Sequence, residues 1–158
     1  MKIDLTKKQF ESLLKLCYIG NWMANAQRTG AKDDPMVQEY EDIYEHIQSL
    51  APKFGLNKLV QWDEECKRYF ATADFEEAED THGLIDEYDE NSFWDDLIER
   101  LADRDFDKAY LEKERKSMSF EEFYTKRQPF EDKWSKEIYK HGVTKLDVHN
   151  KEKLEHKK

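Results

Sequence analysis

The apolar residues at the start of the chain have the spacing of a helix. They recur at intervals of three and four, which places side chains on one helical face, at Phe10, Leu13, Leu14 and Cys17. A second apolar stripe follows another side of the same segment, at Leu16, Ile19, Met23 and Ala26. Thr6, with Gln9 three residues later, forms a capping box at the start, and Gly30 favours an end near Thr29. Because a helix that is apolar on two sides is usually enclosed, we expect this one at the centre of a bundle.

Two further helices are predicted before residue 74. Asp34 followed by Pro35 is typical of a helix start, and one apolar face then follows at Met36, Val37, Tyr40, Ile43, Tyr44, Ile47 and Leu50. Pro52 should end this helix, since the residue before a proline disfavours the helical conformation. A third helix, from about Gly55 to Ala73, is predicted from its apolar residues, Leu56, Leu59, Val60, Cys66 and Phe70. No alternation of period two persists long enough to predict a strand.

The middle of the chain is less regular until residue 92. Residues 74–91 contain Gly83 and predict one or two short helices. Ser92, with Asp95 three residues later, is a capping pattern that predicts the start of a stronger helix. Apolar pairs then recur every four residues, at Phe93-Trp94, Leu97-Ile98 and Leu101-Ala102.

The last helix is predicted from Ser119, whose partner in a capping box is Glu122. Pro129 lies inside the helical pattern and should kink or divide it, and Gly142 should stop it. Beyond Val143 the chain is polar and rich in lysine, so we expect a flexible tail over residues 143–158. Whether its closing residues are native or a cloning remnant stays open.

These patterns predict an all-α fold, a single-domain bundle of about five or six helices over residues 1–142. The length of 158 residues fits one domain. The charged fraction of 39% and the net charge of −10 approach the composition of disordered chains. Nine Phe, eight Tyr and four Trp nevertheless supply enough large side chains to build a core. We therefore expect a folded protein.

The negative charge is concentrated in the middle of the chain. Residues 74–107 contain 15 Asp or Glu against only Arg100 and Arg104. Repulsion within such a segment opposes folding, which favours a cationic partner: a basic protein surface, a metal, or the basic tail of the same molecule. The predicted partner-binding residues are seven carboxylates and one aromatic anchor, namely Asp86, Glu87, Asp89, Glu90, Asp95, Asp96, Glu99 and Tyr88. The alternative interpretation is a solvated face that only keeps the protein soluble.

A divalent metal site is the second hypothesis, and it implies a metal-dependent helical-bundle enzyme. Glu79 and His82 have the Glu-x-x-His spacing that places both ligands on one side of a helix in carboxylate-bridged bundles. Asp86 and Asp89 follow at distances that share this face. A two-metal site of that kind needs a second Glu-x-x-His pair, which the chain lacks. An acidic surface with an incidental histidine is the preferred interpretation.

A polar stripe interrupts the first helix at Asn21, Asn25 and Arg28. We interpret it as the solvent-facing edge of that helix. The alternative is that it lines a pocket with Trp22 or Tyr18 as a wall.

Several classes of protein are disfavoured. The two cysteines, Cys17 and Cys66, are too few and too far apart for a disulfide framework or a zinc knuckle, and we expect buried free thiols. The N-terminus has no signal-like apolar region, and no apolar run is long enough to span a bilayer. The basic residues form no patch for nucleic acid, and neither a phosphate-binding loop nor a nucleophile elbow occurs. The overall expectation is a cytoplasmic, non-enzymatic binding or regulatory protein, an inhibitor for example, without a cofactor. A structural dimer is a third possibility.

Overall fold

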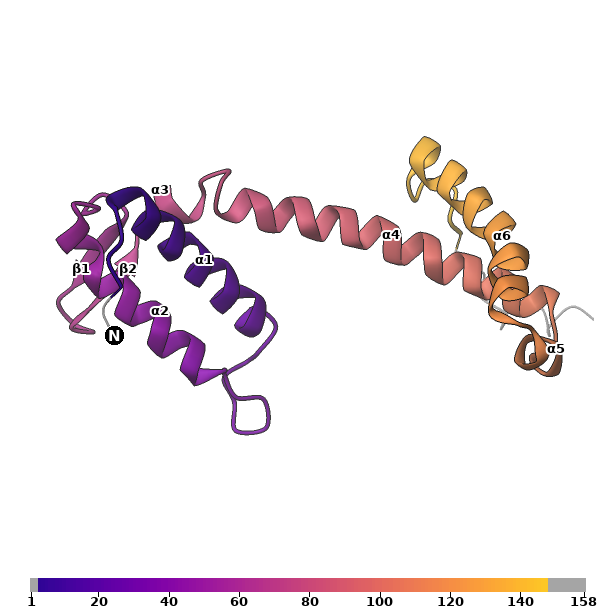
Figure 1. The fold of residues 1–158 in the computed structure, drawn as a ribbon, viewed down its shortest axis with the longest axis horizontal. Helices are drawn as coiled ribbons and strands as arrows, with labels where there is room; N and C mark the ends of the chain where they lie inside the picture. The colour runs from indigo at the N-terminus through magenta and orange to yellow at the C-terminus, as the bar shows by residue number, and fades with distance from the viewer. Residues whose placement is uncertain (1–2, 148–158) are drawn as a thin grey trace, which may run out of the picture. The chain divides into compact units, whose positions relative to one another are not determined.

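The computed structural model describes residues 3–147 and is mostly helical (Figure 1), as predicted. Its elements, in chain order, are α1 (Lys7–Asn25), α2 (Gln38–Leu50), the 3-10 helix η1 (Ala51–Phe54), β1 (Val60–Asp63), β2 (Arg68–Ala71), α3 (Ala73–Glu76), α4 (His82–Ala109), α5 (Glu112–Ser117) and α6 (Phe120–His141). Within the described residues, no helix is both long enough and apolar enough to cross a membrane.

By their packing the residues fall into two compact units, unit 1 (Met1–Asp89) and unit 2 (Glu90–Lys158). The single domain over residues 1–142 stays a prediction, because compactness alone does not show which part of a chain folds independently. Most of the tail predicted over residues 143–158 lies outside the described residues.

The start of α1 is as predicted. The Thr6 hydroxyl accepts the N–H of Gln9 (3.3 Å), and the Gln9 side chain accepts the N–H of Thr6 (2.9 Å). Only one of its two apolar stripes is buried, however. Phe10 and Leu14 are buried, whereas Leu16 and Met23 of the second stripe are 66% and 59% exposed. The expectation of an enclosed helix is therefore wrong, because neighbouring elements cover only one apolar side of α1.

The core of unit 1 gathers around α1, α2, η1 and the hairpin. The ring of Phe10 stacks on that of Phe54, with centroids 4.0 Å apart. Other buried residues of this core are Leu14, Tyr44, Ile47, Ala51, Leu56, Val60 and Phe75. Helix α2 begins later than predicted, because the Asp34 carboxylate instead accepts the N–H of Thr29 (2.9 Å) in the preceding loop.

The third helix predicted over residues 55–73 is wrong, since β1 and β2 form an antiparallel hairpin there. The side chain of Asp63 accepts the N–H groups of Glu65 (2.9 Å) and Cys66 (2.6 Å), a local bonding pattern that favours a turn. Trp62 and Tyr69 are directly opposite on the two strands, with ring centroids 5.1 Å apart, and such pairs stabilise sheets. Cys66 is a free thiol, but it is exposed in the turn rather than buried.

Helix α4 is one continuous helix of 28 residues. Of the one or two short helices expected over residues 74–91, α3 is present, but from His82 that segment belongs to α4, and the predicted helix start at Ser92 is therefore wrong. Ser92 lies inside the helix because neither glycine nor proline interrupts the chain after Gly83 until the helix has ended.

Unit 2 contains the C-terminal part of α4 with α5 and α6. Phe106 is 1% exposed, and its ring meets those of Phe123 and Phe130 edge-on at 5.2 and 5.9 Å. The predicted capping box of Ser119 begins α6, and Gly142 ends it. Pro129 lies within α6 without dividing it. The short helix α5 had no counterpart among the predicted elements.

Candidate functional site

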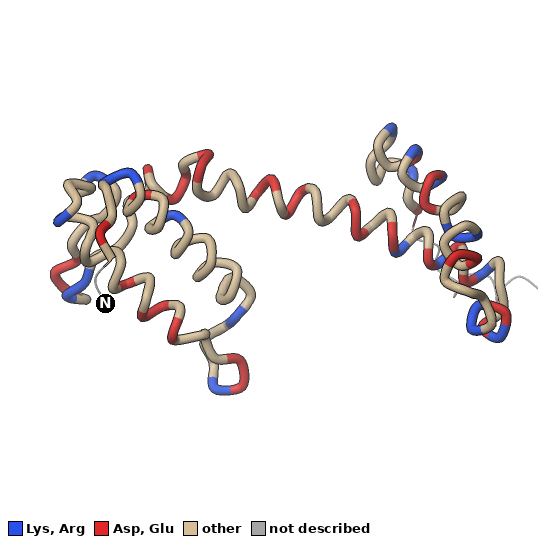
Figure 2. Tube along the Cα trace, viewed as in Figure 1, with Lys and Arg blue, Asp and Glu red and all other residues tan. Residues whose placement is uncertain are grey.

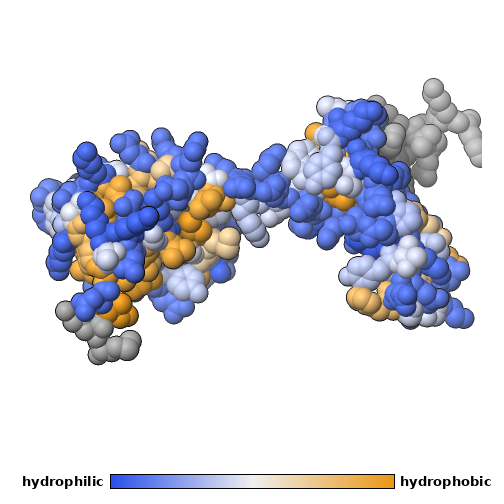
Figure 3. Space-filling view, turned by 45° about the horizontal axis from the view of Figure 1, so that its top comes forward, coloured by the Kyte–Doolittle hydropathy of each residue, from blue (hydrophilic) through white to orange (hydrophobic). Residues whose placement is uncertain are grey.

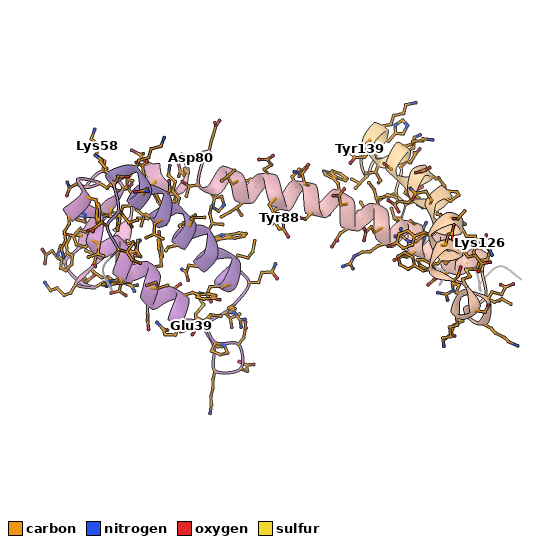
Figure 4. The ribbon with its side chains drawn as sticks, viewed as in Figure 1. Glu39, Lys58, Asp80, Tyr88, Lys126 and Tyr139 are labelled. Carbon is orange, nitrogen blue, oxygen red and sulfur yellow. The ribbon has the colours of Figure 1, made fainter. Side chains whose placement is uncertain are left out.

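The eight predicted partner-binding residues lie on one stretch of α4 and are all exposed. They are Asp86, Glu87, Tyr88, Asp89, Glu90, Asp95, Asp96 and Glu99. Successive helical residues point about 100° apart, so these side chains project on several sides of the helix (Figure 4), Tyr88 being labelled. They do not converge on one point. They form a strongly negative stretch of helix, which Figure 2 shows as repeated red bands.

Few cations lie near this stretch in the described part of the chain. Asp96 has an ion pair with Arg100 at 3.7 Å, in which both side chains are well exposed. The Asp86 carboxylate lies 3.7 Å from His82. Glu90 accepts the indole N–H of Trp94 (2.6 Å), which brings no charge. The remaining four carboxylates have no Lys or Arg within ion-pair distance among residues 3–147, namely Glu87, Asp89, Asp95 and Glu99.

The carboxylates farther along α4 are paired within unit 2. Asp103 accepts from the guanidinium of Arg127 at 2.7 Å, and the same guanidinium bonds Glu131 (2.6 Å). The Arg127 side chain is only 12% exposed. Asp107 pairs with Arg115 in the last turn of α5. These carboxylates thus connect α4 to the two helices that follow it.

Asp105 is the most strongly held of these carboxylates. It accepts hydrogen bonds from Lys133, Arg104 and the indole N–H of Trp134, all at 2.9 Å. Partial burial by itself raises the pKa of Asp105, but these donors outweigh it and lower the pKa to about 2. The ionised form is therefore stabilised by the fold.

Of the residues of the predicted metal site, His82 and Asp86 lie 3.7 Å apart, but the four are not brought together as a set. Glu79 lies in the turn before α4, so that it and His82 are not on one turn of a regular helix. Nδ1 of His82 is 3.0 Å from the Tyr18 hydroxyl, which occupies one of its two nitrogens. Among residues 3–147 there is no group of three or more His, Cys, Asp or Glu arranged to hold a metal ion, and Asp86 and Asp89 remain surface residues of α4.

The polar stripe of α1 is largely internal, which corrects the expected solvent-facing edge. Asn25 is 5% exposed, and its amide oxygen accepts the N–H of Val37 (2.7 Å) just before α2. The side-chain N–H of Asn25 donates to the amide oxygen of Asn21 (2.8 Å), and the side-chain N–H of Asn21 donates to Glu41 on α2 (2.8 Å). These bonds join α1 to the start of α2. Arg28 alone lies at an exposed edge.

The alternative interpretation of that stripe, a pocket walled by Tyr18 and Trp22, corresponds to a cavity in unit 1. This polar cleft has a volume of about 240 Å³ and lies against α1, α2 and β2. Its aromatic walls are Tyr18, Trp22, Tyr44 and Phe70. Its charged lining is Glu41, Glu45, Glu76 and Arg68. Sequence patterns had not indicated Arg68 or Glu76, which lie on β2 and α3 and line the cleft together with residues of α1 and α2.

Residues of α1 and α2 also line an apolar groove of about 420 Å³. It is lined mainly by Cys17, Gly20, Met23, Ala24, Tyr40 and Ile43. A side chain added at Gly20 would begin in open space, since its Cβ would meet no atom within 4 Å. Of the exposed second stripe of α1, Met23 lines this groove. Apolar residues reach the surface of unit 1 (orange in Figure 3).

Comparisons with known proteins identify no relative, since no family model, no curated protein and no solved structure matches the chain.

Proposed function

We propose that this chain is a non-enzymatic binding or regulatory protein that engages a basic partner protein through the carboxylates of α4 between Asp86 and Glu99. One observation supports this most directly. Along a single helix, Asp103, Asp105 and Asp107 are each matched by cations of the same chain. Most of the carboxylates before them are exposed and have no Lys or Arg beside them in the described part of the chain.

The physical consequence is a stretch of helix that attracts positive charge. Unmatched carboxylates repel one another, and this repulsion is relieved when a cationic surface approaches. Exposed charges of this kind accelerate association and select partners more than they add affinity. Tyr88, which is 58% exposed, supplies an aromatic contact on the same stretch.

The test uses a variant in which four unmatched carboxylates are neutralised, Glu87→Gln, Asp89→Asn, Asp95→Asn and Glu99→Gln. A matched control changes the net charge equally at exposed acidic residues elsewhere, with Asp33→Asn, Glu65→Gln, Glu77→Gln and Glu121→Gln. Proteins retained from cell extract by each immobilised variant are compared at roughly 0.05 and 0.5 M salt, since exposed charges are screened at the higher concentration.

The proposal predicts that the wild type and the control retain the same basic proteins at low salt, and that the α4 variant and high salt both release them. Equal retention by the two variants would show that the position of the charge on α4 is irrelevant. Retention that salt leaves unchanged would rule out electrostatic association.

A further inference from the structure

The polar cleft of unit 1 combines aromatic walls with an excess of negative charge. Three carboxylates line it against one guanidinium, that of Arg68. Its volume of about 240 Å³ is smaller than the pockets that usually enclose drug-sized ligands. The cleft therefore suits a group of the size of one side chain.

Arg68 shows how this cleft holds a cation. Its guanidinium lies 4.5 Å from the centroid of the Phe70 ring and 3.2 Å from the carboxylate of Glu45. A ring face on one side and a carboxylate on the other are the two groups that stabilise an organic cation. The chain thus already contains one bound cation of the expected chemistry.

The other two carboxylates of the cleft have no such partner among residues 3–147. Glu41 accepts only the neutral amide of Asn21 (2.8 Å), and Glu76 has no ion pair there. The effect of this negative charge reaches the neighbouring hydroxyls. Burial raises the pKa of Tyr18 and of Tyr44, and the charge of Glu76 raises both further.

We propose that the cleft binds a second monovalent organic cation, an alkylammonium or guanidinium group, between the aromatic residues Tyr18 and Trp22 and the carboxylates of Glu41 and Glu76. In a protein partner this group is the side chain of a lysine or an arginine. The identification of the cation's source rests on the proposed function, whereas the cleft's affinity for the cation itself does not.

The experiment titrates the isotope-labelled full chain with n-butylammonium and n-butylguanidinium ions and follows its amide and indole N–H signals by NMR. n-Butanol, which has a similar apolar part and no charge, is the control ligand. The Trp22 indole signal is assigned with the Trp22→Phe variant. We expect the two cations, and not the alcohol, to shift the signals of Trp22 and of residues lining the cleft.

Three variants determine whether charge in the cleft is responsible. Glu76→Gln removes an unmatched carboxylate and should weaken cation binding roughly threefold to fivefold, the usual effect of one partly exposed charge. Arg68→Gln removes the resident cation and should strengthen binding by a similar factor. Glu79→Gln removes an exposed carboxylate that does not line the cleft and should change the affinity little. All three positions are at least partly exposed, and unchanged amide spectra will show that the fold is kept.

Three results would each overturn the proposal. They are NMR shifts with n-butanol as large as those with the cations, an equal loss of cation affinity in Glu76→Gln and Glu79→Gln, and weaker cation binding by the Arg68→Gln variant. The proposed function is judged separately by the α4 variant, because none of the four substitutions in that variant lines the cleft. Small cations can bind the cleft even if no basic protein binds α4, and the reverse also holds.

Discussion

The carboxylates of α4 fall into two groups that differ in what lies opposite them. From Asp103 to Asp107 the fold places guanidinium, ammonium and indole N–H groups within bonding distance. From Asp86 to Glu99 the carboxylates mostly face solvent. Both groups lie on the same continuous helix, so helix formation does not determine the role of a carboxylate. The neighbouring elements do, because α5 and α6 supply cations to one group only.

The largest expected effect of this difference is seen by comparing two of the arginines that pair with α4 carboxylates, Arg127 and Arg100. Arg127→Met should lower the free energy of unfolding by about 2 kcal/mol, because it leaves Asp103 and Glu131 without their shared partner. Arg100→Met should change it by less than about 0.5 kcal/mol, since that arginine is exposed and pairs loosely with Asp96. Urea unfolding followed by tryptophan fluorescence measures both, and equal losses would contradict the division of α4 into two groups.

A smaller effect is expected from Asp105, and it depends on pH. Its pKa is about 2 in the folded protein against an ordinary value of 3.8. Because the folded value is the lower one, ionisation of Asp105 stabilises the fold above about pH 4, and this contribution is lost as the pH falls through 2. Asp105→Asn should therefore cost roughly 1–2 kcal/mol at neutral pH, after allowance for solvent screening, and progressively less below pH 4.

Asp95→Asn is the control for this measurement, since Asp95 is exposed and has no ion pair in the described part of the chain. The free energy of unfolding of the Asp95→Asn variant should follow that of the wild type across the same pH range. If Asp105→Asn costs as much at pH 2 as at pH 7, the ionised carboxylate of Asp105 is not what stabilises unit 2.

The smallest expected effect on stability is that of the four-site α4 variant. This variant neutralises the side chains of Glu87, Asp89, Asp95 and Glu99. Its free energy of unfolding should stay within about 0.5 kcal/mol of that of the wild type, because surface residues without partners contribute little to folding. A slight increase is consistent with relief of repulsion. Thermal unfolding measures this, and a loss of more than about 1 kcal/mol would mean that these carboxylates have structural partners after all.

Local signals in the sequence predicted helix ends better than they predicted burial. The capping boxes of Thr6 and Ser119 and the stop at Gly142 are formed by neighbouring residues, so their geometry is encoded locally. The two apolar stripes of α1 are alike in spacing, yet Phe10 and Leu14 of one are buried, whereas Leu16 and Met23 of the other are exposed. Which stripe is buried depends on where α2 and the hairpin pack, and this is a non-local property.

The hairpin and most of the cleft's lining were missed for a related reason. Strands of four residues are too short for a clear alternation, and the apolar residues of 55–73 also fit helical spacing. The cleft gathers α1, α2, β2 and α3, and Arg68 meets Glu45 across 23 positions of the chain. The spacing of apolar and polar residues within one segment cannot predict a contact between residues so far apart in the chain. The acidic stretch of α4 was found from charge counts, but those counts did not separate its paired carboxylates from its unpaired ones.

The most direct test of this separation is to map a basic probe on α4 by NMR. Octalysine is titrated into the isotope-labelled full chain at low salt, and amide shifts are compared between residues 86–99 and 103–107. We expect larger shifts in residues 86–99, which roughly 0.5 M salt abolishes, and small shifts in residues 103–107, whose carboxylates already have cations. Equal shifts in the two groups, or shifts that salt leaves unchanged, would contradict this expectation.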